Sequence, residues 1–507
     1  MLTKVHNRMI SGAAVNVADF GAVGDGVVDD TTAIQAAVSY ATSTNSTVEL
    51  MTAHVISSTI LITAPIVIGG SRSYTNITAS FVGPVFQSSA SYCYIKNLNV
   101  SGGASFFKQT ASFEDIFIHN VDWSAAADTL NRHFFYTDLT TMTGEILRIE
   151  SCEALNGVPI YMDNCSVDDI YVTENIFNNP CQFVFRNLDQ LSTGASNNVY
   201  FERNWVFSIN GNLTDKSTTA RCLQVECDNV LYVRDNILNG AESTTASNFI
   251  YFLKCSLVCS GNDISSIKGT STTSVIDDKG QTVGDEDFVI ISNNSFDQTI
   301  VALADSPEAM IRINEKRNVS VHNNKFRSLR CFPCRFYHSS DTGRYPENLS
   351  FSDNEIFDQK HPVACQVFQT IKNIAIKGNK IYSIKNPDSI SVNGRTIPRI
   401  ADVYVSFNNG VNLDGVQIEG NVVFETDSAA AIMTIYRNAA AVTSNILNVS
   451  VVNNELKGGG GAGGCLVHFT SATMAAVDII NNIGPAGIAA TVGTEPAGNR
   501  KVNNVIT

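Results

Sequence analysis

The chain has 507 residues, of which 44% are hydrophobic and only 16% are charged. Its 34 basic and 48 acidic side chains give a net charge of −14. This balance argues against nucleic acid and against an anionic membrane surface as partners. No apolar run approaches the length of a transmembrane helix, so membrane insertion is not expected either.

The chain is predicted to begin with a short attachment peptide, residues 1–16, followed by a cap with the first strands, residues 17–70. The peptide lacks the apolar core of a secretion signal. In the cap, Thr32 and Gln35 have the spacing of a capping box, which predicts a helix start. One face of this helix is apolar, so the helix is suited to cover the open end of a solenoid. The residues of that face are Ile34, Ala37, Val38 and Ala41.

Asparagines recur within residues 71–507 at a mean spacing of about 31 residues, which is typical of a solenoid. Each follows an apolar–polar–apolar alternation, which predicts a short strand with one buried face. We therefore expect an all-β fold, a right-handed parallel β-helix. We expect each Asn to lie at a bend, because Asn tolerates left-handed backbone, and to bond its neighbour in the next coil. The eleven are Asn175, Asn204, Asn236, Asn262, Asn294, Asn324, Asn354, Asn379, Asn421, Asn454 and Asn482.

A second short strand is predicted after each of these asparagines. Several of these strands open with a cysteine, a position that suits a small buried side chain. We therefore expect the twelve cysteines to be mostly reduced thiols. The predicted second strands include Gln182–Arg186, Cys222–Cys227, Ile250–Leu253, Met310–Asn314, Cys334–His338, Cys365–Phe368, Val403–Phe407 and Leu466–Phe469.

Residues 19–38 read DFGAVGDGVVDDTTAIQAAV, and this segment resembles the entry motif of the pectate-lyase-like β-helix superfamily. The motif is especially frequent in bacteriophage tailspikes and capsule depolymerases. Residues 2–17, LTKVHNRMISGAAVNV, resemble the short N-terminal segment of phage tail fibre and spike proteins. The solenoid pattern continues almost to the last residue, without an obvious C-terminal trimerisation module.

The resemblance implies a homotrimer that binds, and often cleaves, a bacterial surface polysaccharide such as a capsule or an O-antigen. It also implies a place in the virion, with attachment to the phage tail or another tail fibre protein through the N-terminus. Such proteins are made in the host cytoplasm, which agrees with the missing signal. The spacing of Asp25, Asp29 and Asp30 matches no calcium loop, and we expect neither a metal nor another cofactor.

The chemistry stays open between three classes of protein. Hydrolysis is expected slightly ahead of elimination by a polysaccharide lyase, and a non-catalytic glycan-binding spike or adhesin is the rival to both. A secreted cellular enzyme of the pectinase type is a further alternative. The hallmark patterns of plant-type polygalacturonases and pectate lyases are absent from the sequence, so pectin is not expected as the substrate.

Hydrolysis of a glycosidic bond requires two carboxyl groups, about 5–5.5 Å apart for retention or about 6.5–9.5 Å for inversion. Equivalent residues of adjacent coils are about 4.8 Å apart. Asp278, with neighbouring Asp277 in the predicted loop Ser265–Asp287, can therefore pair with Asp305 or Glu308 of the next coil. Glu226 is an alternative on an outward strand position. It lies about three coils from Asp305, so that pair would have to form across a trimer interface.

A predicted stripe of basic and aromatic side chains completes the candidate site. Arg forks grip uronate carboxylates, aromatic faces stack on sugar rings, and Arg, Tyr and His also supply the bases of a lyase. Arg186 and Gln224 are predicted to share its outward face. The predicted substrate-binding residues are Arg312, Arg335, Tyr337, His338, Arg344, Tyr345 and Tyr404.

Overall fold

The computed structural model divides into two compact units, Met1–Ser243 (unit 1) and Thr244–Thr507 (unit 2). Each is described by itself. The described residues are 14–71, 73–125, 132–137, 141–188, 196–210, 220–242, 247–268, 274–282, 287–297, 309–314, 316–327, 332–337, 347–359, 363–367, 371–383, 390–392, 395–397, 401–407, 413–425, 431–437, 446–458, 465–469, 477–484, 489–493 and 500–506.

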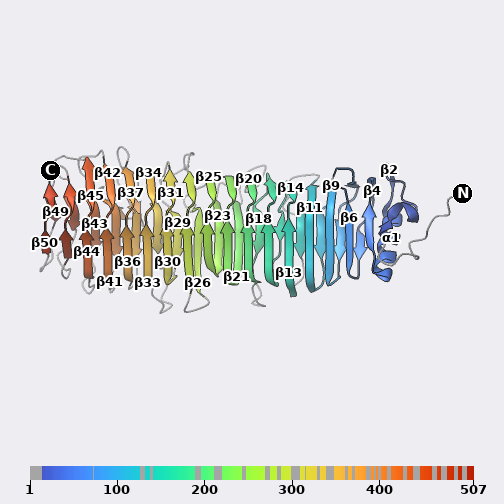
Figure 1. Cartoon of the computed structure of the whole chain (residues 1–507), viewed down its shortest axis with the longest axis horizontal. Coiled ribbons are helices and arrows are strands. Elements are labelled where there is room, and N and C mark those ends of the chain that lie inside the picture. The colour runs from blue at the N-terminus through green and yellow to red at the C-terminus, as the bar shows by residue number, and fades with distance from the viewer. Residues whose placement is uncertain are drawn as a thin grey trace. The chain divides into compact units, whose positions relative to one another are not determined.

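Unit 1 begins with a cap made of the 3-10 helix Val17–Phe20, strand β2 (Asp25–Asp29) and helix α1 (Thr31–Thr44). Figure 1 shows α1 beside the first strands of the unit. The predicted apolar face of the helix is confirmed, because Ile34, Ala37, Val38 and Ala41 are all buried. The helix therefore covers core residues of the first strands.

The predicted capping box does not form. The N-cap residue is Asp30, and the predicted cap Thr32 lies inside the first turn of the helix. The side chain of Asp30 makes no hydrogen bond to that turn. Its carboxylate instead accepts two backbone N–H groups of the preceding loop and the Nδ1 of His54 at 2.7 Å. Gln35 is also engaged elsewhere, because its amide exchanges two hydrogen bonds with the backbone of Leu61. These tertiary partners outcompete the local cap.

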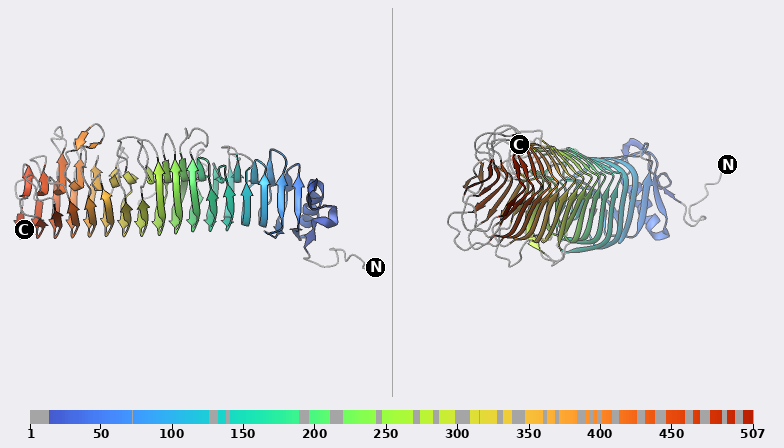
Figure 2. Two further views of the ribbon diagram at one scale, coloured as in Figure 1. Left: turned by 90° about the horizontal axis from the view of Figure 1, so that it is seen from above. Right: turned by 60° about the vertical axis from the view of Figure 1, so that its left-hand side comes forward.

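The strands of unit 1 form two stacks, in which each strand pairs in parallel with those of the coils before and after it (Figures 1 and 2). Strand β21 (Ala220–Arg234) contributes to both stacks. Stack A contains β1 (Val15–Asn16), β2, β3 (Thr47–Leu50), β4 (Ala53–Ile56), β6 (Ile66–Gly70), β7 (Asn76–Ala79), β9 (Tyr92–Gly102), β11 (Phe113–Ser124), β13 (Met142–Glu150), β14 (Glu153–Leu155), β16 (Cys165–Thr173), β17 (Ile176–Asn178), β19 (Ser196–Glu202), β20 (Trp205–Asn210) and β22 (Ile237–Glu242). Stack B contains β5 (Ile60–Ile62), β8 (Pro84–Ser88), β10 (Ser105–Gln109), β12 (His133–Thr137), β15 (Ile160–Tyr161) and β18 (Phe183–Asn187).

Unit 2 repeats the same two stacks, and a short antiparallel hairpin, β38 (Ile390–Val392) with β39 (Arg395–Ile397), is added to it. Stack A contains β24 (Ser256–Ser260), β25 (Asp263–Lys268), β27 (Phe288–Ser292), β28 (Ser295–Asp297), β30 (Asn318–His322), β31 (Lys325–Arg327), β33 (Glu347–Ser352), β34 (Glu355–Gln359), β36 (Ile371–Lys377), β37 (Lys380–Ser383), β41 (Leu413–Glu419), β42 (Val422–Glu425), β44 (Ile446–Val452), β45 (Glu455–Gly458), β47 (Val477–Ile480), β48 (Ile483–Gly484), β50 (Arg500–Val502) and β51 (Val505–Ile506). Stack B contains β23 (Ser247–Lys254), β26 (Ile276–Thr282), β29 (Ala309–Asn314), β32 (Phe332–Tyr337), β35 (Val363–Val367), β40 (Ala401–Phe407), β43 (Ala431–Arg437), β46 (Cys465–Phe469) and β49 (Ala489–Gly493). The predicted parallel β-helix is confirmed.

The asparagines form the predicted ladder inside each unit. In unit 1 the side-chain amide of Asn175 donates to the Oδ1 of Asn204 at 3.0 Å, and Asn204 donates to Asn236 in the same way. In unit 2 equivalent bonds run from Asn262 to Asn504. The scaffold role of these residues is thereby confirmed.

The bend itself falls one residue before each ladder asparagine, which corrects the sequence prediction. Glu174 precedes Asn175 and has a φ of 60°, and Arg203 precedes Asn204 with a φ of 54°. The left-handed residue faces outward, where its side chain is unconstrained by packing. The asparagine that follows is buried and satisfies carbonyl groups at the turn that would otherwise lack a donor.

Apolar side chains fill the space between the stacks, and stacked Phe rings run through the core of unit 1, as with Phe107 and Phe135 at 5.8 Å. Nine cysteines within the described ranges are buried thiols outside any disulfide, as expected from the sequence. Among the described residues, no helix is both long enough and apolar enough to cross a membrane.

Candidate functional site

The outward side of stack B in unit 1 carries a continuous row of polar and aromatic side chains, one from each coil. Lys108, Tyr136, Tyr161, Arg186 and Gln224 occupy this row in register on β10, β12, β15, β18 and β21. We call these five residues the B row. The parallel register repeats the same outward position at every coil, so residues far apart in sequence meet on one surface.

A carboxylate held by Arg186 and Tyr161 lies beside the B row. The Nε and Nη2 of Arg186 donate to both oxygens of Asp163 at 2.7–2.9 Å, and the Tyr161 hydroxyl donates to Oδ2 at 2.9 Å. The side chains of Arg186 and Asp163 are 18% and 8% exposed. The guanidinium also lies over the Tyr161 and Phe183 rings. This fork is fixed in place and largely removed from water, which strengthens its hydrogen bonds.

The pKa values of these groups follow from burial and from the Asp163 charge. Burial raises the pKa of Tyr161, and the negative charge of Asp163 raises it further, so the hydroxyl stays a donor. Burial opposes the charge of Arg186, but the hydrogen bonds and charge of Asp163 outweigh it and raise the pKa of the guanidinium. The cluster therefore keeps a cation and a phenol hydroxyl at neutral pH.

His133 and Tyr136 extend the cluster toward the N-terminal end of the row. Their rings stack at 4.8 Å, and the Nδ1 of His133 donates to the carbonyl of Val158 at 3.1 Å. Burial lowers the pKa of His133 to about 4, so the imidazole is neutral at pH 7. Lys108 lies over the Tyr136 ring, with Nζ at 5.6 Å from its centroid. The ring faces in this part are thus covered by protein groups.

Glu226, a predicted catalytic residue, lies near this cluster on β21 and is 5% exposed. Tyr161 pairs with Arg186 one coil on, and Asn187 with Val225. Asp163 lies in the turn two residues after β15, where the N–H of Asn164 donates to the carbonyl of Leu188 at 2.9 Å. If both registers are extended to Leu188, Asp163 and Glu226 align with that residue, two coils apart. Their Cα atoms are then about 9.6 Å apart, which leaves their carboxyl groups near the separation of an inverting pair.

Unit 2 presents a second acid–base row on the outward side of stack B. Asp277, Arg312 and Arg335 follow one another in register on β26, β29 and β32. The Nε and Nη2 of Arg312 donate to the two oxygens of Asp277 at 2.7 and 2.6 Å. The guanidinium of Arg335 is buried opposite Arg312. Arg312 and Arg335 therefore occupy equivalent positions on neighbouring strands.

Asp278 is placed on a strand and not in the loop that the sequence suggested. It pairs in register with the buried Phe252, is 1% exposed, and accepts the backbone N–H of Asn314 at 2.9 Å. Tyr337 and Tyr404 lie on β32 and β40, where Tyr404 shares the register position of Arg335. Five predicted residues lie outside the described ranges: Asp305, Glu308, His338, Arg344 and Tyr345.

Sequence reasoning missed Asp163, Tyr161 and Tyr136. Asp163 stands 23 residues before Arg186, close to one coil, and that spacing is a usable signal once the coils are aligned. The asparagine ladder gave no alignment there, because it begins only at Asn175 and the earlier coils are irregular. Within the described ranges, no group of three or more His, Cys, Asp or Glu side chains is placed to hold a metal ion.

Comparison with known proteins agrees with the fold. Residues 14–227 match the family described as rhamnogalacturonase A/epimerase, pectate lyase-like, and no curated protein matches the chain. Similar solved structures include an exopolygalacturonase from Thermotoga maritima, with 12% identity over 98% of this chain and 92% of that one, and a TM-score of 0.37.

Two others are PfbA, a surface adhesin of Streptococcus pneumoniae, and the tailspike of Pseudomonas phage phi297. The adhesin is 12% identical over 73% of this chain and 92% of its own, with a TM-score of 0.32. The tailspike is 10% identical over 95% of this chain and 81% of its own, with a TM-score of 0.31. Residues 14–227 thus match a pectate-lyase-like family, and the described residues form a parallel β-helix.

Proposed function

We propose that this chain is a phage tailspike that binds and depolymerises a bacterial surface polysaccharide, a capsule or an O-antigen, by glycosidic hydrolysis. The observation that carries the proposal is the alignment of Asp163, in the turn after β15, with Glu226 on β21, with Arg186 on the intervening strand β18. Two carboxyl groups at such a separation are what an inverting glycosidase requires.

In the proposed reaction, Glu226 protonates the leaving glycosidic oxygen while Asp163 accepts a proton from the attacking water. The bond between the anomeric carbon and the leaving oxygen breaks as the bond to the water oxygen forms on the opposite face of the sugar. Arg186 orients Asp163 through its two-point contact. One proton enters the leaving group and one leaves the water, so Asp163 must release its proton to solvent and Glu226 must regain one before the next turnover.

For unit 2 we keep the pair predicted from sequence, Asp278 with Asp305 or Glu308, as a second proposed catalytic site. Glycan contacts are proposed there for Arg312, Arg335, Tyr337, His338, Arg344, Tyr345 and Tyr404. The burial of Asp278 and its bond to Asn314 suit a carboxyl group that is held rigidly. Cleavage rates of Asp278→Asn in unit 2 and of Glu226→Gln and Asp163→Asn in unit 1 distinguish the two proposed sites.

The test uses purified full-length chain and capsular or O-antigen polysaccharides from a panel of strains. Wild type should release new reducing ends without ultraviolet absorbance. Glu226→Gln and Asp163→Asn should each lower the rate at least 100-fold while retaining glycan binding. Glu174→Gln is the matched control, because Glu174 is an exposed acid of the same unit paired with Arg203. Unchanged cleavage in both site variants, with loss in Asp278→Asn, would move the activity to unit 2.

Elimination is the second candidate, and the neutral imidazole of His133 favours it, because its ring contacts those of Tyr136 and Tyr161, and Arg186 lies over the Tyr161 ring. A lyase needs a base and a cation that neutralises a uronate, and these types lie together here. Products that absorb in the ultraviolet as unsaturated uronates would establish the lyase. A glycan that binds tightly yet stays full length would instead establish a non-catalytic spike or adhesin.

For assembly we propose a homotrimer in the virion, attached through its N-terminus to the phage tail or to another tail fibre protein. An aromatic surface on stack A of unit 1 supports the self-association. The half-buried rings of Tyr171, Tyr200 and Tyr232 stack at 4.6 and 4.8 Å with planes within 5°. Their faces cover one another and leave a flat surface of ring edges. Light scattering should give the mass of three chains, and a monomer would favour a cellular enzyme.

A further inference from the structure

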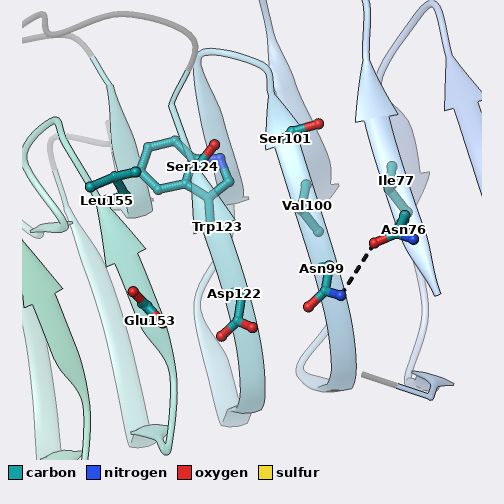
Figure 3. A pocket seen from close by; sticks show the side chains of 10 residues that line it. All are labelled: Asn76, Ile77, Asn99, Val100, Ser101, Asp122, Trp123, Ser124, Glu153 and Leu155. Carbon is teal, nitrogen blue, oxygen red and sulfur yellow. Dashed lines mark hydrogen bonds between the residues drawn. The ribbon is translucent and has the colours of Figure 1, made fainter. Parts of the chain in front are cut away.

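A cavity of about 370 Å³ lies on the outward side of stack A in unit 1, whereas the B row lies on stack B (Figure 3). It spans the ends of β7, β9, β11 and β14, just after the bends at Asn97, Asn120 and Ser151. Its size falls in the range of small-ligand pockets, about 300–1,000 Å³.

The cavity wall is built by two parallel rows of polar side chains. Asn76, Asn99, Asp122 and Glu153 follow one another in register, one per coil. Figure 3 shows Asp122 and Glu153 side by side in this row, with the amide of Asn99 donating to Asn76 at 3.2 Å. The opposite carboxylates have Cβ atoms about 5 Å apart, as residues opposite each other on neighbouring strands do.

The second row adds hydroxyl groups, and the space between the rows is apolar. Ser101 and Ser124 are in register two residues after Asn99 and Asp122, and the exposed Leu155 continues this row on β14. Between the rows, Val100 and Trp123 point inward and are 4% and 1% exposed. The Trp123 ring is therefore packed in the core and touches the cavity without offering a face for stacking.

The charge of the wall decides which ligands fit. Among the described lining residues there are two carboxylates and no cationic side chain, so an anionic glycan is repelled. Carboxylate, amide and hydroxyl oxygens at about 4.8 Å intervals suit a ligand rich in hydroxyl donors. A divalent cation would need six or more oxygen ligands, and the described residues hold no cluster of three candidate side chains.

We infer that this cavity binds an uncharged hexose unit of a glycan, as a site separate from the B row. The carboxylates of Asp122 and Glu153 accept the sugar hydroxyls, and the amides of Asn76 and Asn99 exchange hydrogen bonds with them. Asn178 holds Glu153 in position by donating to its Oε1 at 3.0 Å. The inference rests on the cavity alone and does not require the proposed hydrolysis.

The two tryptophans of the chain allow a specific test. Trp205 is 49% exposed and lies away from the cavity lining, whereas Trp123 lines it. In a Trp205→Phe background the fluorescence therefore reports Trp123 alone. The probes are methyl α-glucopyranoside, methyl β-galactopyranoside, methyl α-mannopyranoside, glucuronic acid and calcium chloride, each titrated against the full chain.

We expect at least one neutral glycoside to change the Trp123 emission saturably, and glucuronic acid to bind at least tenfold more weakly. Asp122→Asn should weaken the glycoside at least fivefold, and Ser124→Phe, which fills the cavity, should abolish its binding. Glu114→Gln, an exposed acid on the same strand, should leave it unchanged. Saturation-transfer NMR measures the same binding without relying on tryptophan emission. If Ser124→Phe does not fold, Asp122→Asn remains the deciding variant.

The inference is overturned if no neutral glycoside binds, if binding is equal in the Asp122→Asn and parent proteins, or if calcium alone saturates the signal. Cleavage that is unchanged in Glu226→Gln and Asp163→Asn, with the glycoside titration intact, would refute the proposed hydrolase site and leave this site standing. Absence of glycoside binding with cleavage intact would refute this site and leave the proposed hydrolase standing.

Discussion

Replacement of one interior ladder residue, Asn324→Ala, should destabilise unit 2 by about 4 kcal/mol. Asn324 is 1% exposed. Its amide donates to the Ile291 carbonyl at 2.9 Å and to the Oδ1 of Asn354 at 3.0 Å. Its Oδ1 accepts both the backbone N–H and the side-chain amide of Asn294 at 3.0 Å. Four buried hydrogen bonds are therefore lost together.

The magnitude follows from the net value of a hydrogen bond, about 1 kcal/mol with a range of about 0.5–1.5. Four bonds give about 4 kcal/mol. The backbone N–H of Asn294 also loses its partner in a buried position, which adds to the cost when no water replaces it. An effect of this size is at the upper end of what single substitutions produce.

The control is Asn348→Ala, which removes the same residue type from a coil-to-coil ladder at the surface. Asn348 is exposed, donates to Asn318 at 3.0 Å and accepts from Asn373 at 3.0 Å. Water can replace both bonds, and the left-handed backbone of Asn348, with a φ of 56°, adds about 1 kcal/mol for Ala, so we expect a loss of about 1–2 kcal/mol. Urea unfolding followed by circular dichroism gives both values. Equal losses in the two variants would refute the claim that burial makes the ladder stabilising.

Three further predictions concern unit 1. The pKa of His133 is depressed from 6.5 to about 4, so its contribution is complete above pH 6.5 and is lost as the pH falls toward 4. His133→Asn should then lose about 3 kcal/mol less unfolding free energy than wild type between pH 7 and pH 4, and parallel pH curves from urea titrations would contradict this. Gly157→Ala should cost more than about 2 kcal/mol, because φ is 77° and the new Cβ would lie 2.6 Å from the Arg132 carbonyl. Gly21→Ala, with φ of 97° and open space around it, should cost only about 1 kcal/mol in the same thermal melts, and a larger loss there would refute the reasoning from contact. Arg186→Ala should lower glycan cleavage at least tenfold, because Asp163 loses its two-point contact, and an unchanged rate in the reducing-end assay would mean that Asp163 is not positioned by it.

The repeat predicted the fold well because a stacked coil imposes the same demand at every level. Asn175 and its successors each fill one turn, and the alternation before them fixes which strand face is buried. The prediction erred by one residue at the bend, because sequence does not separate the outward Glu174 from the inward Asn175. Both are polar, and only the register of the buried amides decides between them.

The candidate site was less predictable, because it depends on contacts between irregular coils. Arg186 was assigned to the outward face by alternation, and its partner Asp163 could not be found without the length of the preceding coil. Asp278 looked like a loop acid, since Asp and Gly residues near it are typical of turns. The structure extends strand β26 through it, because its neighbours in register continue the parallel ladder.

The central claim is that the outward side of stack B in unit 1 holds the scissile glycan. A crystal structure of Glu226→Gln with an oligosaccharide from a cleaved polysaccharide tests it most directly. The account predicts a sugar ring between Asp163 and residue 226, with its glycosidic oxygen within hydrogen-bond distance of the Gln side chain. Continuous density for the glycan elsewhere, with that surface of stack B bare, would contradict it.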